Sequence, residues 1–515
     1  MEIFQWILAM LVGAVCLTAL ARTINVPYPS LLALGGVVLA LLPAGPELAL
    51  DPELTLVLFV APVLLDAAFD TSVRDLRANW IPIACLVLAA IGITTISVAW
   101  TAHAMIPEMS WAAAIALGAI VAPPDAAAAS AVLKQLHLPH RLLVILEGES
   151  LLNDASALLI YRIAVLAVMS SGIELSVVLP LSLLSIVGSV FAGYILARLY
   201  VRLALGVADV PSSIVLQFAG AFGTWILAER LHLSAIVTIV VYAITVARDA
   251  PSLMPAKRRI PSYAVWDLAV FVLNVLAFVL IGLQLRPILS SLDPAQRFEY
   301  FSVAAIVLGI VVAARFFWVF SYLLVARLKL RWLGPGRWPG PAGPTPRSSL
   351  VVSWCGMRGI VTLAAAYALP SEFPHRDFIL LTAFCVVVGT LVVQGLTLRP
   401  LIVSLKLRDD GSVRREVALA CERLAHAGLA VLSDDQSSHA RGLREELEAQ
   451  LRHVSSDQPM GELGQYDALR ARIVAVQRQA LLGMRSSGEI GDDAFHRVEA
   501  ELDVAELNAL GAQYS

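Results

Sequence analysis

Residues 147–155 read Glu-Gly-Glu-Ser-Leu-Leu-Asn-Asp-Ala, near the middle of an apolar run that extends from residue 141 to 169. The run exceeds the ~20 residues that a helix needs to cross ~30 Å of hydrocarbon. On such a helix Glu147, Ser150 and Asp154 share one face, while Glu149 and Asn153 form a pair on an adjacent face. Ionisable side chains inside a bilayer are costly, so the stretch predicts a functional site in a membrane-spanning helix.

The rest of the first 404 residues has the same apolar character. The chain of 515 residues is 58% hydrophobic and 15% charged, with a mean hydropathy of +0.78, whereas a soluble domain carries ~25% charged residues. This composition excludes a soluble globular enzyme and predicts an all-α polytopic membrane protein. Thirteen spans are expected, at 3–21, 27–43, 53–70, 80–101, 110–133, 141–169, 176–204, 212–229, 232–247, 263–285, 299–326, 349–369 and 377–403.

The charges of the loops set the orientation. With the C-terminus in the cytoplasm, the predicted inner loops hold sixteen Lys and Arg residues and the outer loops hold four, as expected when basic residues stay inside. We therefore expect a multi-pass protein of the cell membrane with its N-terminus outside. From residue 405 the composition changes, because the last 111 residues hold thirteen basic and nineteen acidic side chains. This segment predicts a cytoplasmic tail, with helical patterning over 441–452 and 468–484, whose role is either a solvated appendage or regulation or stabilisation of a dimer.

The net charge and the cysteines exclude two further classes. The net charge is −3, so there is no basic excess for a nucleic acid partner. The cysteines contain no C-x-x-C pair and read as small apolar side chains, which indicates neither a disulfide framework nor a zinc site. They are Cys16, Cys85, Cys355, Cys385 and Cys421.

Four ionisable residues fall at similar depths in different spans. At ~1.5 Å of rise per residue, Asp154 lies ~20 Å along its span, Asp66 and Asp125 ~20–22 Å along theirs, and Arg358 ~15 Å along the twelfth. Glu149 needs a counter-charge, and Arg358 is the expected partner, bridging spans 6 and 12. For Arg315, near the interior of span 11, we expect an acid such as Asp267.

Two spans are interrupted near these charges. Pro123-Pro124 precedes Asp125, and Gly356 and Gly359 flank Arg358. A helix broken at mid-membrane exposes carbonyls that must face protein, water or an ion, and transporters place cation sites there. Carboxylates, a hydroxyl and carbonyls suit an alkali cation or a proton. Because desolvation disfavours a charged carboxylate, the two would compete, which is the minimum mechanism of an antiporter.

Several motifs resemble the bacterial sodium/proton antiporters of the cation/proton antiporter-1 family, relatives of the eukaryotic sodium/proton exchangers. The motifs cover the membrane portion. They are Ala122-Pro-Pro-Asp-Ala-Ala-Ala-Ala-Ser-Ala131, Glu147-Gly-Glu-Ser-Leu-Leu-Asn-Asp-Ala155, Leu64-Leu-Asp-Ala-Ala68, Trp354-Cys-Gly-Met-Arg-Gly-Ile-Val361 and Gly389-Thr-Leu-Val-Val-Gln-Gly-Leu-Thr-Leu398.

The resemblance implies an inverted-repeat fold in which a core domain, with crossed broken helices in spans 5 and 12, moves against a dimerisation domain. It implies a homodimer in the cell inner membrane, no cofactor, and Na⁺ (or Li⁺ or K⁺) and H⁺ as the transported ions. Na⁺ would bind at Asp154, Asp125, Ser150 and Asp66. The remaining implied residues are Asn153 and the Pro124 carbonyl in the cation and proton site, and Glu149 and Arg358 as a structural ion pair.

Two departures bear on the cation. The family's common Thr-Asp-Pro is here Pro124-Asp125-Ala126, so a hydroxyl is absent, and Asp66 stands where some relatives have Glu. Asn153 beside Asp154 leaves one carboxylate fewer than paired aspartates, and the resemblance implies electroneutral one-for-one exchange that serves cytoplasmic pH and Na⁺ homeostasis. A K⁺/H⁺ antiporter is the alternative. A passive channel lacks a visible filter, and an intramembrane aspartyl protease lacks its Tyr-Asp and Gly-x-Gly-Asp contexts.

Overall fold

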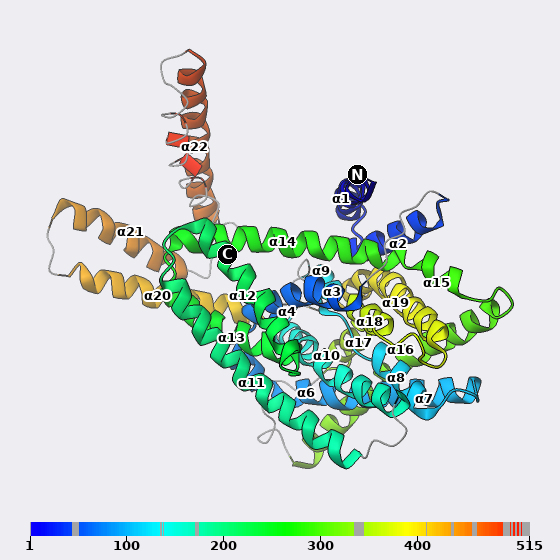
Figure 1. The fold of residues 1–515 in the computed structure, drawn as a ribbon. Coiled ribbons are helices and arrows are strands. Elements are labelled where there is room, and N and C mark those ends of the chain that lie inside the picture. Colours follow the sequence, from blue (N-terminus) through cyan, green and yellow to red (C-terminus); the bar gives the residue numbers. More distant parts are fainter. Residues whose placement is uncertain are drawn as a thin grey trace. The chain divides into compact units, whose positions relative to one another are not determined.

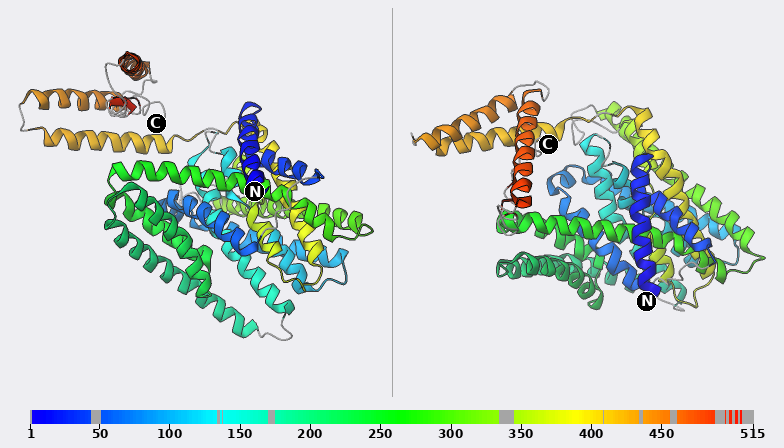
Figure 2. Two further views of the ribbon diagram at one scale, coloured as in Figure 1. Left: turned by 45° about the horizontal axis from the view of Figure 1, so that its top comes forward. Right: turned by 90° about the horizontal axis from the view of Figure 1, so that it is seen from above.

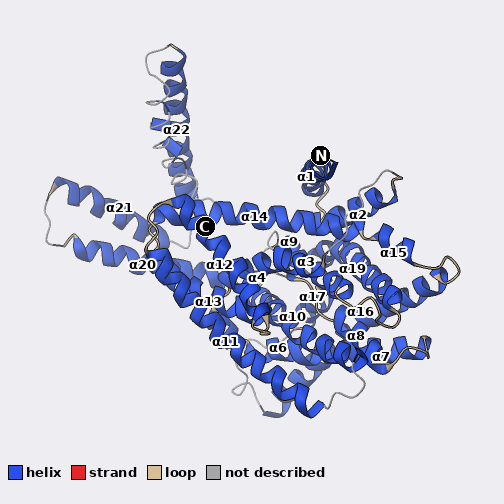
Figure 3. Cartoon of the chain, in the orientation of Figure 1, coloured by secondary structure: helices blue, strands red, loops and turns tan. Residues whose placement is uncertain are grey.

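The computed structural model of the chain describes residues 2–43, 51–133, 138–169, 175–333, 345–407, 409–433, 437–455 and 461–487, with isolated positions elsewhere. Every regular element among these residues is a helix (Figure 3). The chain divides into two units, Met1–Asp410 and Gly411–Ser515. The division follows the last long apolar helix, which ends at Leu405, and the sequence places its boundary at 404/405.

The first unit contains the helices of the predicted spans (Figure 1). They are α1 (Glu2–Thr23), α2 (Tyr28–Leu41), α3 (Pro52–Thr55), the π-helical turn η1 (Leu56–Val60), α4 (Ala61–Asp70), α5 (Val73–Ala78), α6 (Trp80–Ala84), the π-helical turn η2 (Cys85–Ala90), α7 (Ile91–Met105), α8 (Trp111–Val121), α9 (Ala126–Leu133), α10 (His140–Met169), α11 (Leu175–Leu205), α12 (Val210–Arg230), α13 (Ala235–Leu253), α14 (Ala256–Leu283), α15 (Leu285–Ser291), α16 (Arg297–Leu333), α17 (Pro346–Trp354), α18 (Ile360–Tyr367) and α19 (Arg376–Leu405).

Each predicted span falls on one of these helices or on a consecutive series of them. Among the residues described, nine helical segments are long and apolar enough to cross a membrane, and α2 and α8 are shorter apolar helices. The prediction of an all-helical, multi-pass membrane protein is confirmed. Spans 3 and 4 each contain a π-helical turn that the sequence did not reveal.

The helices of the first unit pack in two sets. In one, α8 contacts α7 and α10, and α16 contacts α7, α17 and α19. In the other, α2 packs on α14 and α11 packs on α13, so that α11, α12 and α13 gather along one flank (Figures 1 and 2). The helices α2 and α14 approach at Gly36 and Gly282, where an added Cβ would overlap the facing backbone. Small residues allow such close crossings between helices in membranes.

The second unit begins with an antiparallel hairpin of α20 (Ser412–Val431) and α21 (Ser438–Ser455), followed by α22 (Gly461–Ser486). The helical patterning expected over 441–452 and 468–484 lies within α21 and α22. Residues 456–460, where the sequence indicates a break, lie outside the described residues.

Candidate functional site

The two interrupted spans meet at their interruptions. Span 5 is broken between α8 and α9 at residues 122–125, and span 12 is broken between α17 and α18 at residues 355–359. The Asp125 amide donates a hydrogen bond to the Met357 carbonyl, with an N···O distance of 2.6 Å. Each break therefore satisfies a backbone group that the other break leaves without an intrahelical partner. Inside a membrane such groups must be hydrogen-bonded within the protein.

Gly359 is required by the approach of Asp125. A Cβ at position 359 would overlap Oδ2 of the Asp125 carboxylate. This places the carboxylate directly before α18, whose N-cap is Gly359, while Asp125 itself directly precedes α9. The N-terminal ends of two half-helices carry partial positive charge, so both favour the ionised form of this side chain.

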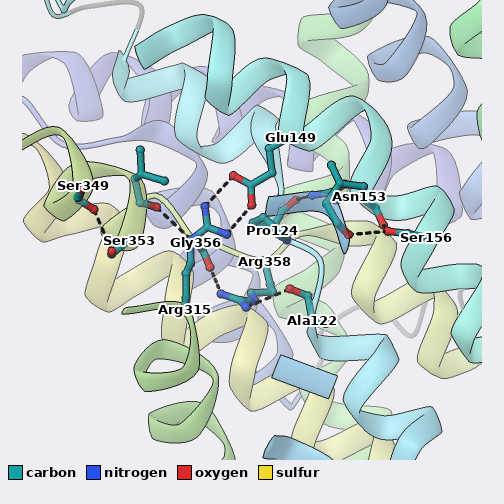
Figure 4. A network of polar contacts seen from close by, with 12 residues as sticks. Ala122, Pro124, Glu149, Asn153, Ser156, Arg315, Ser349, Ser353, Gly356 and Arg358 are labelled. Carbon is teal, nitrogen blue, oxygen red and sulfur yellow. Dashed lines mark hydrogen bonds and ion pairs between the residues drawn. The ribbon is translucent and has the colours of Figure 1, made fainter. Parts of the chain in front are cut away.

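Arg358 binds the end of the other half-helix. Its guanidinium is buried and donates to the carbonyls of Val121 and Ala122, at 3.0 and 3.1 Å, and to the carbonyl of Gly356. Its backbone amide donates to Oγ1 of Thr390 at 3.0 Å. The Val121 and Ala122 carbonyls stand at the end of α8, before the Pro123-Pro124 break, so the arginine neutralises the negative end of α8 (Figure 4).

Glu149 pairs with Arg315, not with Arg358. The two Glu149 oxygens accept from Nη1 and Nη2 of Arg315 at 2.6 and 2.8 Å, and both side chains are at most 3% exposed (Figure 4). The expected pair of Glu149 with Arg358 is therefore wrong, because Arg358 is committed to the α8 carbonyls. The expected pairing of Arg315 with Asp267 is wrong too, since Asp267 is an exposed residue of α14.

Arg315 also binds the broken helix α17. Its Nε donates to the Val352 carbonyl, in the last turn of α17, at 3.0 Å. Arg315 and Arg358 thus play matching roles at the C-terminal ends of α17 and α8. Sequence reasoning missed this role because Arg315 stands in a long apolar helix with no motif around it; an arginine in the middle of a span was the available signal.

Asn153 ties α10 to the break in span 5. It is fully buried, and its Nδ2 donates to the Pro124 carbonyl at 2.7 Å. Its Oδ1 has no hydrogen-bond partner among the described residues. The Pro124 carbonyl, predicted as a cation ligand, therefore already accepts one bond and keeps one lone pair.

Asp154 is a buried carboxylate, 8% exposed, on the next residue of α10. Among the described residues no hydrogen bond to its side chain is present, in contrast to the paired Glu149. Its charge and that of Asp125 lie within electrostatic range of each other. Two nearby carboxylates in different surroundings, one before two helix N-termini and one without donors, are suited to different protonation states.

A cavity of ≈ 40 Å³ lies next to these groups, between α9 and the first half of α10. This volume holds a few waters or one partly hydrated ion, since one water needs roughly 10–15 Å³. Among the predicted site residues, Asp125, Ser150 and Pro124 line it, whereas Asn153, Asp154 and Asp66 are not part of its wall. Its other polar lining residues are Glu147, Glu149 and Ser130.

Ser130 was missed by sequence reasoning. It stands in the Ala-rich run after Asp125, and its position on α9 brings it to the cavity wall facing α10. Asp66 lies on α4, which packs against α10, and it is partly buried. The structure thus places Pro124, Asp125 and Ser150 around the cavity, Asn153 in contact with the Pro124 carbonyl, Asp154 next to Asn153 on α10, and Asp66 on the neighbouring helix α4.

A polar contact anchors the start of α10. His140 Nε2 lies 3.1 Å from Oδ2 of Asp75 on α5, the short helix that links spans 3 and 4. Burial raises the pKa of Asp75, but hydrogen bonds from His140, Arg74 and Ser72, with the charge of Arg74, outweigh it and lower that pKa below its ordinary value. The linker is therefore held to the helix that carries Ser150 and Asp154.

The site offers hard oxygen ligands around a cavity that holds a few waters, next to two broken membrane helices whose C-terminal ends are bound by arginines. Oxygen ligands of this kind suit small hard cations and protons, and transporters place cation sites at breaks in membrane helices. The fold and the site define a secondary transporter. The chain belongs to the sodium/hydrogen exchanger family, whose transmembrane model matches residues 7–404. It is a cation/proton antiporter and not an enzyme.

Individual relatives agree with this assignment. The chain is 29% identical to an uncharacterised Na⁺/H⁺ exchanger of Mycobacterium bovis, over 98% of this chain and 96% of the relative. It is 31% identical to a sodium, potassium, lithium and rubidium/H⁺ antiporter of Bacillus pumilus, over 77% of this chain and 61% of that one. The fold resembles the sodium proton antiporter MjNhaP1 of Methanocaldococcus jannaschii, with a TM-score of 0.61 at 17% identity over 79% and 98% of the two chains.

Proposed function

We propose that this antiporter exchanges one monovalent cation, with Na⁺ preferred, for one proton, and that the two ions compete for Asp154. The observation that carries the proposal is the contrast between two neighbouring carboxylates. Asp125 lies at the N-terminal ends of α9 and α18, whereas Asp154 is buried and accepts no hydrogen bond from the residues that the structure describes. Asp125 then stays charged, and Asp154 exchanges its proton for the cation.

The remaining ligands complete the cation site. Ser150 and the free lone pair of the Pro124 carbonyl supply neutral oxygens beside the carboxylates, and Oδ1 of Asn153 is a buried acceptor without a partner among the described residues. Asp66 contributes a further carboxylate from α4. The ion would then touch a helix outside the set that contains α7, α8, α10, α16, α17 and α19. Only one carboxylate titrates in this scheme, which makes the exchange electroneutral and suits cytoplasmic pH and Na⁺ homeostasis.

The orientation and the movement follow from the topology. With thirteen crossings, the N-terminus outside and the tail in the cytoplasm, the first half of α10 faces the cytoplasm. The cavity beside Ser150 then belongs to the inward-facing state. Alternating access arises when the core with the crossed broken helices moves against the dimerisation domain of a homodimer in the cell inner membrane, while Arg315 and Arg358 keep the half-helices together.

Transport in proteoliposomes tests the proposal. Na⁺, Li⁺ and K⁺ are supplied separately across a range of pH to the wild type, to Asp154→Asn, and to Asp267→Asn as a matched control on an exposed position of α14. We expect the first variant to lose exchange with every cation and the control to keep it. Exchange by Asp154→Asn would overturn the assignment, and a rate that changes with clamped membrane potential would overturn electroneutrality.

The K⁺/H⁺ alternative has a specific observation in its favour. The Bacillus pumilus relative is named for sodium, potassium, lithium and rubidium, and in this chain Pro124, which has no hydroxyl, stands before Asp125. A site with fewer fixed hydroxyls discriminates less between cations of different size. Exchange driven by K⁺ as readily as by Na⁺ in the same vesicles would replace the Na⁺ preference with a broad one.

A further inference from the structure

A large crevice lies between α10 and the helices α11, α12 and α13, and α6 and η2 also line it. Its volume is ≈ 960 Å³, against ≈ 40 Å³ for the cavity beside Ser150. Its lining residues on α10 run from Leu152 to Leu166, which is ~21 Å of helix at ~1.5 Å per residue. The crevice therefore extends over much of the ~30 Å of hydrocarbon. No residue assigned to the cation site lines it.

The walls of the crevice suit hydrocarbon and not water. Large apolar side chains along it are exposed, among them Leu88 at 67% and Leu181 at 66%. Because these residues belong to membrane-spanning helices, they face lipid. Between the two ends, Ser156 is the one polar side chain among the described lining residues, and its hydroxyl already contacts the carbonyls of Val87 and Asn153. An ordered water needs 2–4 polar partners, so an acyl chain is the better occupant.

The helices α6 and α10 begin at the same end of the crevice. In the first turn of α10, Arg141 Nε donates to Oδ1 of Asn79, directly before α6, at 2.9 Å. Farther along both helices, the Ser156 hydroxyl lies 3.1 Å from the Val87 carbonyl. Arg77, in the linker helix α5 just before this point, therefore lies at the end of the crevice where both helices begin.

The two ends of the crevice differ in charge. At the far end, Arg162 of α10 lies within electrostatic range of Glu229 of α12, and both line the crevice, so their charges offset each other. At the near end, Arg77 is the one charged residue among the described residues of the lining. It is exposed and has no ion pair with the residues that the structure describes, while the neighbouring Asp75 pairs with Arg74 and His140. The near end is therefore basic.

We propose that this crevice binds an anionic phospholipid, with its phosphate at Arg77 and its acyl chains along α6, η2 and α10. An arginine fork matches the oxygens of a phosphate. Trp80 follows Arg77 by one turn, is 63% exposed and lines the same end, and tryptophan is enriched at the level of the lipid headgroups. A zwitterionic lipid carries its own positive group, so the net positive charge of this end selects a lipid with net negative charge.

A lipid in this position would contact both sets of membrane helices. The helix α10 carries Asp154 and packs with α8, whereas α11 packs with α13 in the other set. If the two sets move against each other, as proposed above, the exchange rate should depend on anionic lipid in the vesicles. That consequence rests on the proposed function, whereas binding of the lipid does not.

Native mass spectrometry of the purified full-length protein tests the proposal. Phosphatidylglycerol and phosphatidylcholine with the same acyl chains are added separately to delipidated protein, and bound lipid is counted. We expect the wild type to bind phosphatidylglycerol more tightly. Arg77→Gln should weaken phosphatidylglycerol about fivefold, the effect of one arginine near an anionic headgroup, and leave phosphatidylcholine unchanged. Ala84→Trp, which fills part of the crevice from α6, should weaken both.

Arg202→Gln and Ile96→Trp are the matched controls and should bind both lipids as the wild type does. Arg202 is exposed in the last turn of α11, and the four spans between it and Arg77 put both on the same face of the membrane. Ile96 is 68% exposed on α7. Neither residue lines the crevice. Because Arg77 is exposed, Arg77→Gln decides the question even if Ala84→Trp does not fold.

A phosphatidylglycerol with a photoreactive acyl chain locates the site. We expect labelled peptides from residues 80–90 and 152–166 in the wild type, and a loss of this label in Ala84→Trp. Equal binding of the two lipids by the wild type, equal weakening in Arg77→Gln and Arg202→Gln, or a label confined to other helices would overturn the proposal, as when a second copy fills the crevice. None of these measurements uses transport, so a failed assignment of Asp154 would leave them unchanged.

Discussion

The pairing of Glu149 with Arg315 makes a quantitative prediction about stability. Their side chains are 2–3% exposed and joined by two charge-assisted hydrogen bonds, and Arg315 also binds the Val352 carbonyl. Removing one partner of a buried pair leaves an uncompensated charge and costs about 3–5 kcal/mol. Glu149→Leu and Arg315→Leu should each cost this much, and the second also orphans a carbonyl, which adds about 1–3 kcal/mol.

The double variant Glu149→Leu/Arg315→Leu should cost far less than the sum, because it leaves no unpaired charge. We expect a coupling energy of about 3 kcal/mol from the double-mutant cycle. The same cycle between Glu149 and Arg358 should give a smaller coupling energy, since their charges interact but no direct bond joins them. The free energy of unfolding is measured in mixed micelles by SDS titration, with tryptophan fluorescence as the signal.

Two results would refute this reasoning. Equal coupling of Glu149 to both arginines would mean that the two arginines share its carboxylate. The hydrogen bonds of Arg358 to the carbonyls would then not hold Arg358 away from Glu149. Additive losses for Glu149→Leu and Arg315→Leu would mean that water reaches the pair and screens it. A transport assay on the same variants separates the effects, because a purely structural pair changes the amount of folded protein more than the exchange rate per folded molecule.

Three shorter predictions concern the site and its anchor. Gly359→Ala should abolish exchange, because its Cβ would overlap a carboxylate oxygen, whereas Gly223→Ala, with open space around its Cβ position, should retain it in the same vesicles. Asn153→Ala should raise the Na⁺ concentration for half-maximal exchange roughly tenfold or more, since a lost buried bond costs about 1–3 kcal/mol. The lowered pKa of Asp75 means that its contact with His140 stabilises the fold above the unfolded pKa of ~3.9 and is lost as pH falls through the folded value. In Asp75→Asn the melting temperature should therefore decline less on acidification from about pH 6 to about pH 3 than in the wild type, and an equal decline would contradict the assignment.

Local sequence features predicted most of the fold. Apolar runs long enough to span hydrocarbon coincide with the helices because each such segment must satisfy its own backbone hydrogen bonds in lipid. The interruption at Pro123-Pro124 was predictable from the missing donors of proline. The π-helical turns in spans 3 and 4 were not predicted from the sequence.

The candidate site was predictable in its members and not in its contacts. Spacing on one helix placed Ser150 and Asp154 together, and chemistry singled out Asp125. The cavity residue Ser130 could not be found this way, because the side of α9 that faces α10 depends on how the chain re-enters the helix after the break.

The sequence by itself determined where the chain crosses lipid, where two crossings break, and which charges lie at mid-depth, because these depend on local hydropathy, backbone chemistry and rise per residue. Only the tertiary structure decided which charge meets which. Arg358 binds the carbonyls at the end of α8. Arg315, more than 150 residues away from Glu149 in the sequence, pairs with Glu149 instead. A buried charge binds the partner that packing brings within about 3 Å. The spacing of two residues along the chain does not determine that distance.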